Sequence, residues 1–185
     1  IYVNSSGEVM LDIYCVAAVA PACKTVMYFA PNTFQGFIDT ITAATNDTTY
    51  SPSVISISWG TTDTNWLSSD RSSFESALQA ATVKGITVFV AAGDYGVKAI
   101  STASTYTVQY PGTSPYVVSA GGTVISINDN YTIASEVPWG TSGGTWAAGG
   151  GVSTIYPVPS WQTGLTSKLY PGGSVSALTG RGTPD

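Results

Sequence analysis

The chain alternates between segments in which apolar residues recur every three or four positions and short runs of β-branched and aromatic residues. The first pattern is typical of amphipathic helices and the second of strands. Helices are predicted over residues 8–20, 33–46 and 71–84. Strands are predicted at residues 24–30, 53–60 and 86–92, with one or two more between residues 114 and 127.

This order of elements predicts an α/β fold. Strands that alternate with helices form a parallel sheet with helices on both faces and right-handed crossovers, and such sheets bind ligands at the carboxyl ends of their strands. Residues 86–92 form a nearly continuous apolar run, which is expected for a strand buried on both faces. From Asn128 onward the chain is rich in Gly, Trp, Ser and Pro, so we expect loops and short strands packed over the sheet in the same domain.

The composition fits a soluble globular protein. With 185 residues, of which 43% are hydrophobic, the chain is long enough for one domain with a substantial core. The most apolar stretch, residues 13–22, is too short to cross a membrane and contains Pro21. We therefore expect no membrane association.

The charge content argues against a nucleic-acid partner. Only 9% of the residues are charged, with 6 Lys and Arg against 11 Asp and Glu, so no basic patch is available to neutralise phosphates. So few basic groups also produce little self-repulsion once carboxylates are protonated, and the composition therefore suits an acidic medium.

Histidine is absent, which removes the usual general base of serine and cysteine hydrolases and the commonest metal ligand. Cys15 and Cys23 are too few for a disulfide framework or a zinc site, and either a bridge between them or two buried thiols fits the sequence. Three N-x-S/T triplets, at Asn4, Asn46 and Asn130, favour a secretory route only weakly.

Two acidic residues, Glu8 and Asp12, lie four positions apart on the first predicted helix. Like charges at this spacing destabilise an isolated helix by a few tenths of a kcal/mol. Two acids near a helix amino terminus can complement the helix dipole or cap the first turn, but Asp12 lies a full turn further along. The pair therefore fits either a helix-end role or a chemical one.

A third acid, Asp94, directly follows the apolar strand in the segment "AAGDYG", and a second strand ends in "SISWG". Both positions fall where α/β sheets place ligand contacts. Asp94 can equally cap a following helix or close an Asx-turn.

Taken in order, the segments resemble one family, the sedolisins or serine-carboxyl peptidases, and within it the kumamolisin-like branch. The matching segments are "GEVMLDI", "VMYFAPNT", "SVISISWG", "GITVFVAAGDYG", "YPGTSPYVVSAGGT", "EVPW", "GGGVSTIYPVPSWQ" and "GRGTPD". They cover nearly the whole chain in the family's order. The resemblance implies a subtilisin-like fold.

The resemblance also implies peptide-bond hydrolysis by a serine whose general base is a glutamate, which here corresponds to Glu8, with Asp12 as its partner. Asp94 corresponds to the acid of the oxyanion hole. A protonated carboxyl group can donate a hydrogen bond to an oxyanion, whereas a carboxylate repels it, so this chemistry needs an acidic setting.

By the same resemblance Ser58, Trp59 and Gly60 are expected to bind the substrate backbone as an added strand. Gln109 falls at a position that borders the S1 pocket and often carries a charge in relatives. A neutral amide there is expected to weaken any preference for a charged P1 side chain.

One departure from the family is that no serine in residues 1–185 matches the nucleophile, which follows the "PD" segment in relatives. The calcium ligands of the family also lie beyond that point, and strands preceding the first helix are missing. We therefore expect residues 1–185 to be the central part of a single peptidase domain, either cleaved and still associated with its other segments or only partly represented by this sequence. Its partners would be a peptide or protein substrate and a second polypeptide segment of the same precursor that carries the serine.

Such an enzyme is expected to be secreted or to act in an acidic compartment. The alternative from another class is a catalytically inactive relative that serves as a binding or inhibitory module. A glycan-binding protein that uses Trp139 or Trp146 has no positive support in the sequence.

Overall fold

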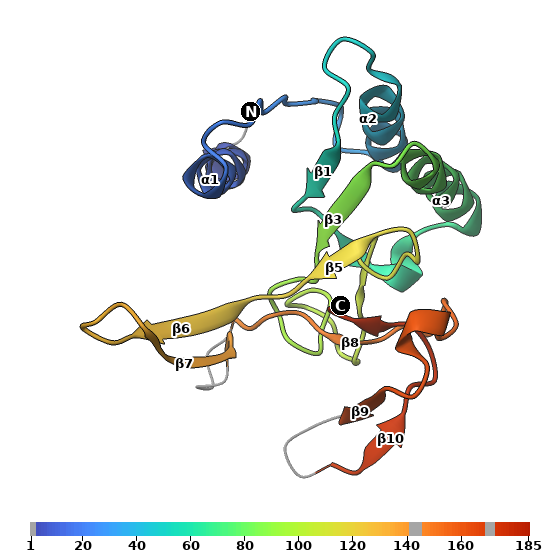
Figure 1. Ribbon diagram of the computed structural model, residues 1–185. Helices are drawn as coiled ribbons and strands as arrows, with labels where there is room; N and C mark the ends of the chain where they lie inside the picture. Colours follow the sequence, from blue (N-terminus) through green and yellow to red (C-terminus); the bar gives the residue numbers. More distant parts are fainter. Residues whose placement is uncertain (1–2, 141–145, 169–172) are drawn as a thin grey trace.

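The computed structural model describes residues 3–140, 146–168 and 173–185. At its centre is a three-stranded parallel sheet in the order β1-β3-β5, formed by β1 (Val54–Ile57), β3 (Thr87–Ala91) and β5 (Val118–Ala120) (Figure 1). Ile57 pairs with Val90, and Ala91 pairs with Ala120. The predicted parallel α/β organisation is confirmed.

Two helices, α2 (Phe34–Asn46) and α3 (Ser68–Val83), lie side by side on one face of this sheet (Figure 1). Thr33 caps α2, because its Oγ1 accepts a hydrogen bond from the Gly36 N–H at 3.0 Å. The α2 prediction is confirmed within one residue, whereas α3 begins one turn earlier than predicted. Gly85, with φ of 77°, follows α3 in the left-handed conformation that glycine tolerates.

The hydrophobic core lies between these helices and the sheet. Phe74 and Leu78 of α3 are fully buried against Val88 and Val90 of β3. The Trp66 ring lies 5.4 Å from Phe74 and 4.9 Å from Tyr110, centroid to centroid, so an aromatic cluster closes the core at the carboxyl end of the strands.

The other face of the sheet is different. α1 (Val3–Val19) lies on that side but apart from the strands (Figure 1), and it begins five residues before the predicted start. Phe89 of β3 is 39% exposed and Val54 of β1 is 55% exposed. The prediction of a strand buried on both faces is therefore wrong for the described part of the chain, because only α2 and α3 pack closely on the sheet.

Residues 24–30 were predicted as a strand, and this prediction is also wrong. The segment is extended, but it pairs with no other described segment, so its β-branched and aromatic residues do not enter a ladder. Met27 and Phe29 are exposed there.

Short strands occupy the rest of the chain, as predicted. β2 (Thr61–Thr62) pairs with β4 (Gln109–Tyr110), β8 (Gly151–Val152) with β11 (Gly182–Thr183), β9 (Thr166–Lys168) with β10 (Val175–Ala177), and β6 (Thr123–Ile127) with β7 (Ile133–Pro138). The described residues also include the 3₁₀ turns η1 (Asp63–Asn65) and η2 (Ser160–Gln162). The β6–β7 hairpin projects away from the sheet instead of packing over it (Figure 1).

An ion pair between a buried arginine and a partly exposed aspartate anchors the last described segment. Arg181 is 0% exposed, and its Nη1 and Nη2 donate to Asp185 Oδ1 at 2.9 Å and Oδ2 at 2.7 Å. Its remaining donors reach the carbonyl oxygens of Ser114 and Val117, and Asp185 Oδ2 also accepts from the Ser119 N–H. The guanidinium therefore ties residues 181–185 to β5 and to the loop before it.

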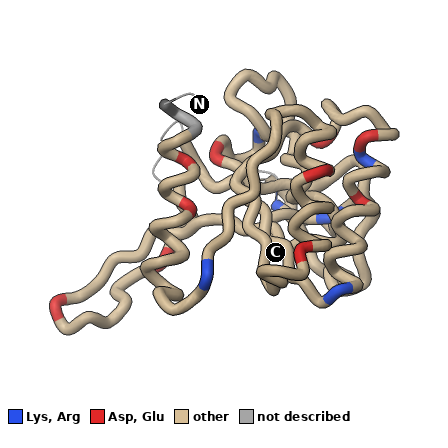
Figure 2. The backbone as a smooth tube through the Cα atoms, turned by 90° about the horizontal axis from the view of Figure 1, so that it is seen from above, with Lys and Arg blue, Asp and Glu red and all other residues tan. Residues whose placement is uncertain are grey.

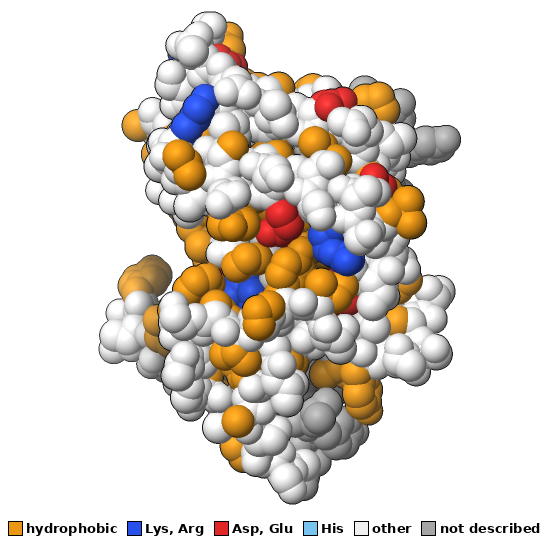
Figure 3. Space-filling view, turned by 90° about the vertical axis from the view of Figure 1, so that its right-hand side faces the viewer, with side chains coloured by type: hydrophobic (Ala, Val, Ile, Leu, Met, Phe, Trp, Pro, Cys, Tyr) orange, Lys and Arg blue, Asp and Glu red, His pale blue; other side chains and the backbone are white. Residues whose placement is uncertain are grey.

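Charged residues are few and dispersed. Figure 2 shows acidic and basic positions scattered along the whole backbone, and Figure 3 shows isolated charged side chains among uncharged ones on the side of α2 and α3. No helix in the described part of the chain is long and apolar enough to cross a membrane. Cys15 and Cys23 are free and exposed, so neither the bridge nor the buried thiols considered from the sequence are present.

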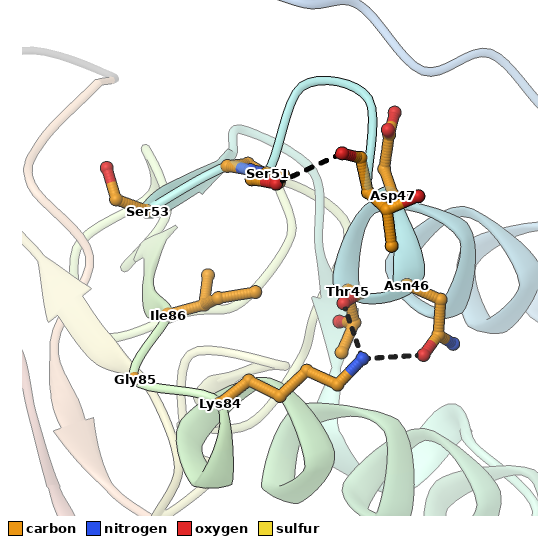
Figure 4. Close-up of a pocket in the computed structure, with 10 residues that line it drawn as sticks. Thr45, Asn46, Asp47, Ser51, Ser53, Lys84, Gly85 and Ile86 are labelled. Carbon is orange, nitrogen blue, oxygen red and sulfur yellow. Dashed lines mark hydrogen bonds between the residues drawn. The ribbon is translucent and has the colours of Figure 1, made fainter.

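A surface hollow of about 370 Å³ lies at the amino-terminal end of β1 and β3, lined by the ends of α2 and α3 (Figure 4). The Lys84 side chain crosses from the end of α3 to α2. Its Nζ donates to the Thr45 carbonyl oxygen at 3.0 Å and to Asn46 Oδ1 at 2.8 Å. This hollow is at the opposite end of the strands from the residues singled out in the sequence.

Candidate active site

The carboxyl ends of β1 and β3 bring two of the predicted residues to one edge of the sheet. Ser58 directly follows β1, and Asp94 lies three residues after β3. Because Ile57 pairs with Val90 in a parallel register, both segments leave the sheet on the same side. The sheet therefore fixes the spacing of these two segments.

α1 adds the acidic pair to this edge. The Ser58 hydroxyl donates a hydrogen bond of 2.6 Å to Asp12 Oδ1, although the two residues are 46 positions apart. This contact fixes one turn of α1 beside the end of β1. The sequence predicted Ser58 only as a substrate contact, and nothing in the spacing signalled its bond to Asp12.

Glu8 lies one turn before Asp12 and is half-buried. Burial raises the pKa of the Glu8 carboxyl above its ordinary value of 4.5, and the negative charges of Asp12 and Asp94 raise it further. The charge of Asp94 acts on Glu8, so the turn after β3 lies within electrostatic range of α1. Three acids from two separate segments thus influence one another at this edge of the sheet.

The helix-end alternative for the acidic pair does not fit the structure. α1 starts at Val3, so no acidic residue lies in its first turn, and Glu8 and Asp12 fall in its interior. There the helix dipole gives little stabilisation to a negative charge. The two carboxyls are held together at an electrostatic cost, as expected of a site with a chemical function.

Asp94 lies in the turn between β3 and residue 96. Its carboxyl group is exposed and makes no hydrogen bond to another described residue, and no helix follows it. The capping and Asx-turn alternatives therefore fail for this residue. Within the described part of the chain, the side chain is thus exposed and has no hydrogen-bond partner.

The predicted substrate-contact residues lie beside this edge. Trp59 is 39% exposed, and Gly60 leads into β2. Gln109 of β4 packs between two strand-end glycines: a Cβ at Gly60 would lie 2.8 Å from Gln109 Oε1, and one at Gly93 would lie 3.0 Å from its Nε2. The Gln109 amide also donates to the Ala99 carbonyl oxygen at 2.7 Å, so its orientation is fixed.

The sequence did not predict a second site, in which one buried carboxyl accepts hydrogen bonds from hydroxyl groups. Glu75 of α3 accepts hydrogen bonds of 2.9 Å from both the Ser114 and the Tyr156 hydroxyls. Burial raises the Glu75 pKa above its ordinary value by more than the hydroxyl donors of Tyr110, Ser114 and Tyr156 lower it. Ser114 is fully buried, so this serine and carboxyl pair has a packing role and cannot receive a substrate.

The described residues offer no metal site of ordinary composition. No three His, Cys, Asp or Glu side chains within them gather closely enough to hold an ion. The calcium expected from the resemblance therefore has no ligand set in this part of the chain, and its expected ligands after residue 185 stay a prediction. Ser142, the serine of the Gly-rich segment "GTSGG", lies outside the described residues.

Comparisons with known proteins identify the family. The model of the subtilase family matches residues 4–182. The chain is 40% identical to kumamolisin from Bacillus sp. (strain MN-32) over 179 residues, which cover 97% of this chain and 32% of kumamolisin. It is 26% identical to tripeptidyl-peptidase 1 from Homo sapiens, over 96% of this chain and 32% of that protein. The chain thus spans about a third of the length of these relatives.

Among solved structures, a Pseudomonas sedolisin, described as a serine-carboxyl proteinase complexed with two molecules of pseudo-iodotyrostatin, aligns with a TM-score of 0.61. The alignment covers 80% of this chain and 48% of that one at 24% identity, which supports the fold. The family match over residues 4–182 shows that the chain belongs to the subtilase family, and within that family it is similar to kumamolisin.

Proposed function

We propose that this chain supplies the acidic catalytic groups of a serine-carboxyl endopeptidase that works in acid. The observation that carries the proposal is that Glu8 lies one turn from Asp12 and within electrostatic range of Asp94, at the carboxyl edge of a subtilisin-like sheet. Carboxyls that act on one another favour proton sharing, and a carboxylate general base works best in a medium near its own pKa. The nucleophilic serine is expected from a segment outside residues 1–185.

Glu8 is the proposed general base. Its carboxylate takes the proton from the serine hydroxyl as the serine oxygen attacks the carbonyl carbon of the peptide bond, and it later gives this proton to the leaving amine. Asp12 is its proposed partner, and the 2.6 Å bond from Ser58 holds the Asp12 carboxyl in place. Water then attacks the acyl enzyme, again with Glu8 as the base.

Asp94 is the proposed oxyanion donor. When protonated, its carboxyl can donate a hydrogen bond to the negative oxygen that develops on the carbonyl. Its exposure and its lack of a described hydrogen-bond partner leave this donor available. The role requires acid, since an ionised Asp94 would repel the oxyanion.

The proposed substrate is a peptide or protein whose backbone lies along Ser58, Trp59 and Gly60. Gln109, fixed between Gly60 and Gly93, presents an uncharged amide near the expected P1 side chain. We therefore expect peptides with neutral P1 residues to be cleaved at least as well as those with Lys or Arg. A panel of peptides that differ only at P1 measures this preference.

The direct test uses the active full-length protein that contains this chain. Glu8→Gln should lower kcat by about 10²- to 10⁴-fold, the usual contribution of a general base. Asp94→Ala should lower it by about 10²- to 10³-fold, as does loss of one oxyanion donor. Glu136→Gln, at an exposed site on β7, is the matched control and should leave kcat unchanged.

Activity should fall in strong acid as Glu8 becomes protonated. Asp12→Asn removes one of the negative charges that raise the Glu8 pKa, so the acid limb of the pH profile of kcat/KM should move to lower pH. A wild-type protein that is inactive between about pH 3 and 6 and does not bind a peptide aldehyde would instead support an inactive binding or inhibitory module.

Calcium and localisation remain part of the proposal. The family resemblance leads us to expect calcium bound by residues after 185, and secretion or delivery to an acidic compartment. Chelation should lower the thermal unfolding temperature of the full-length protein. An unchanged unfolding temperature would argue against the calcium site.

A further inference from the structure

The turn that carries Asp94 is paired along its length with a segment distant in sequence, residues 146–150. The Gly149 N–H donates to the Gly93 carbonyl oxygen at 2.6 Å, and the Ala147 N–H donates to that of Asp94 at 2.8 Å. In the opposite direction, the Gly96 N–H donates to the Ala147 carbonyl oxygen at 3.1 Å. These bonds hold the backbone on both sides of the Asp94 side chain.

Gly149 approaches the turn too closely for any side chain. A Cβ on this buried residue would lie 2.8 Å from the Gly93 nitrogen and would overlap the carbonyl group of Ala92. These neighbours are backbone atoms that lead directly from β3 into the Asp94 turn. A side chain at position 149 must therefore displace that turn.

An aromatic contact supports the outer end of the same pairing. The rings of Tyr95 and Trp146 lie 5.1 Å apart, centroid to centroid, and Trp146 is 53% exposed. The pair thus joins the residue after Asp94 to the start of the 146–150 segment. Because Trp146 is largely exposed, its removal should cost the fold little.

We propose that residues 146–150 position the Asp94 carboxyl and that Gly149 is the positioning residue that sets its distance from the reacting carbonyl. This inference rests on the proposed function of Asp94 as the oxyanion donor. Since the Asp94 carboxyl makes no hydrogen bond to another described residue, its place is set by its own backbone, and that backbone is held by this segment. A donor aimed at a developing charge acts only when it is accurately placed.

The test compares Gly149→Ala with wild type in the active full-length protein, by steady-state kinetics and by inhibition with a peptide aldehyde. The aldehyde forms a hemiacetal with the catalytic serine, and its oxygen occupies the oxyanion position. Gly149→Ala should lower kcat about 10- to 100-fold and lower the affinity for the aldehyde inhibitor by a similar factor, while KM changes less than about 3-fold. A purely structural defect would lower the active fraction without selectively weakening the aldehyde.

Gly122→Ala is the matched control, because a Cβ at Gly122 would meet its nearest atoms, in Trp139, at 3.9 Å. It should leave kcat, KM and aldehyde affinity unchanged. Trp146→Ala is the milder second variant and should lower kcat about 2- to 10-fold with KM retained. It tests the proposal even if Gly149→Ala does not fold.

Each outcome decides the question. Gly149→Ala with wild-type kcat and aldehyde affinity, or an unfolded Gly149→Ala together with an unaffected Trp146→Ala, would overturn the positioning role alone. An inactive wild-type protein would overturn the proposed function and this inference with it. A parallel loss of kcat and aldehyde affinity supports both.

Discussion

The two faces of the central sheet hold their helices in opposite ways. α2 and α3 share a hydrophobic core with the strands, in which Phe74 and Leu78 are 0% exposed. No described side chain of α1 is fully buried, and the Asp12–Ser58 hydrogen bond ties this helix to the end of β1. The packed face fixes the strand ends, whereas the α1 face keeps its acids accessible to protons. Damage to the first should appear as lost stability, and damage to the second as lost activity.

Among the variants that test this comparison, Phe74→Ala on the packed face is expected to lose the most unfolding free energy. The Phe74 ring lies 5.4 Å from Trp66 and 5.9 Å from Tyr110, and the cavity left behind should cost about 3–5 kcal/mol of unfolding free energy. Urea denaturation measures this loss. Tyr131→Ala, at a residue 92% exposed on the hairpin, should cost less than about 0.5 kcal/mol. Equal losses in the two variants would remove the distinction between core and periphery.

Asp185→Asn should cause the next largest loss, about 3 kcal/mol of unfolding free energy, because it leaves the fully buried Arg181 guanidinium without its counter-ion. Burial alone would raise the Asp185 pKa, but the bonds from Arg181 and the Ser119 N–H hold it below its ordinary value of 3.8. The stabilisation is therefore present above that pH and is lost as the pH falls through the lowered pKa. Urea unfolding near pH 5 and near pH 2 should show the variant and wild type converging in acid. A difference that stays constant with pH would contradict the ion-pair account.

Glu75→Gln tests a carboxyl on the packed face whose contribution to stability changes with pH in the direction opposite to that of Asp185. Burial raises the Glu75 pKa above 4.5, so its contribution to stability is fully present below that pH and is lost as the pH rises through the raised pKa. The stability of the variant relative to wild type should therefore increase from about pH 4 to pH 7, by on the order of 1 kcal/mol. Urea unfolding at both pH values gives this difference. Glu136→Gln, exposed on β7, should show no such trend.

The smallest effect is expected from Ser58→Ala on the α1 face. Loss of the bond to Asp12 should lower kcat/KM about 3- to 10-fold, since one hydrogen bond is worth about 0.5–1.5 kcal/mol, and should barely change the unfolding temperature. Ser56→Ala, at an exposed residue of β1 two positions before Ser58, is the control and should change neither. If Ser58→Ala destabilised the protein as much as Phe74→Ala, α1 would be part of the packed structure after all.

Local signals predicted α2 and failed for α1 and residues 24–30. Thr33 and the spacing of Phe37, Ile41 and Ala44 carry both the start and the buried side of α2. The residues before Glu8 are mostly polar and lack apolar positions at helical spacing, so the sequence did not predict the first turn of α1. Residues 24–30 have strand propensity, but pairing depends on a distant partner, which propensity does not encode.

For the candidate site, the acids were predictable and their supports were not. Glu8, Asp12 and Asp94 stand out by spacing, by position at a strand end and by family resemblance. The Ser58–Asp12 bond joins residues 46 positions apart, and no local pattern marks it. Among three consecutive glycines, only backbone packing against Ala92 distinguishes Gly149 from its neighbours.

The Lys84 contact described at the ends of α2 and α3 has a consequence for work in acid. Both helices end there with partial negative charge on their last carbonyls, and the Lys84 ammonium follows α3 and reaches the last turn of α2. One cation thus compensates two helix dipoles, in a chain with only 6 basic residues. The acceptors of this contact are a backbone carbonyl and an amide oxygen, which do not titrate as carboxylates do. The clasp between these two helices should therefore keep its strength at pH values that neutralise carboxylate bridges.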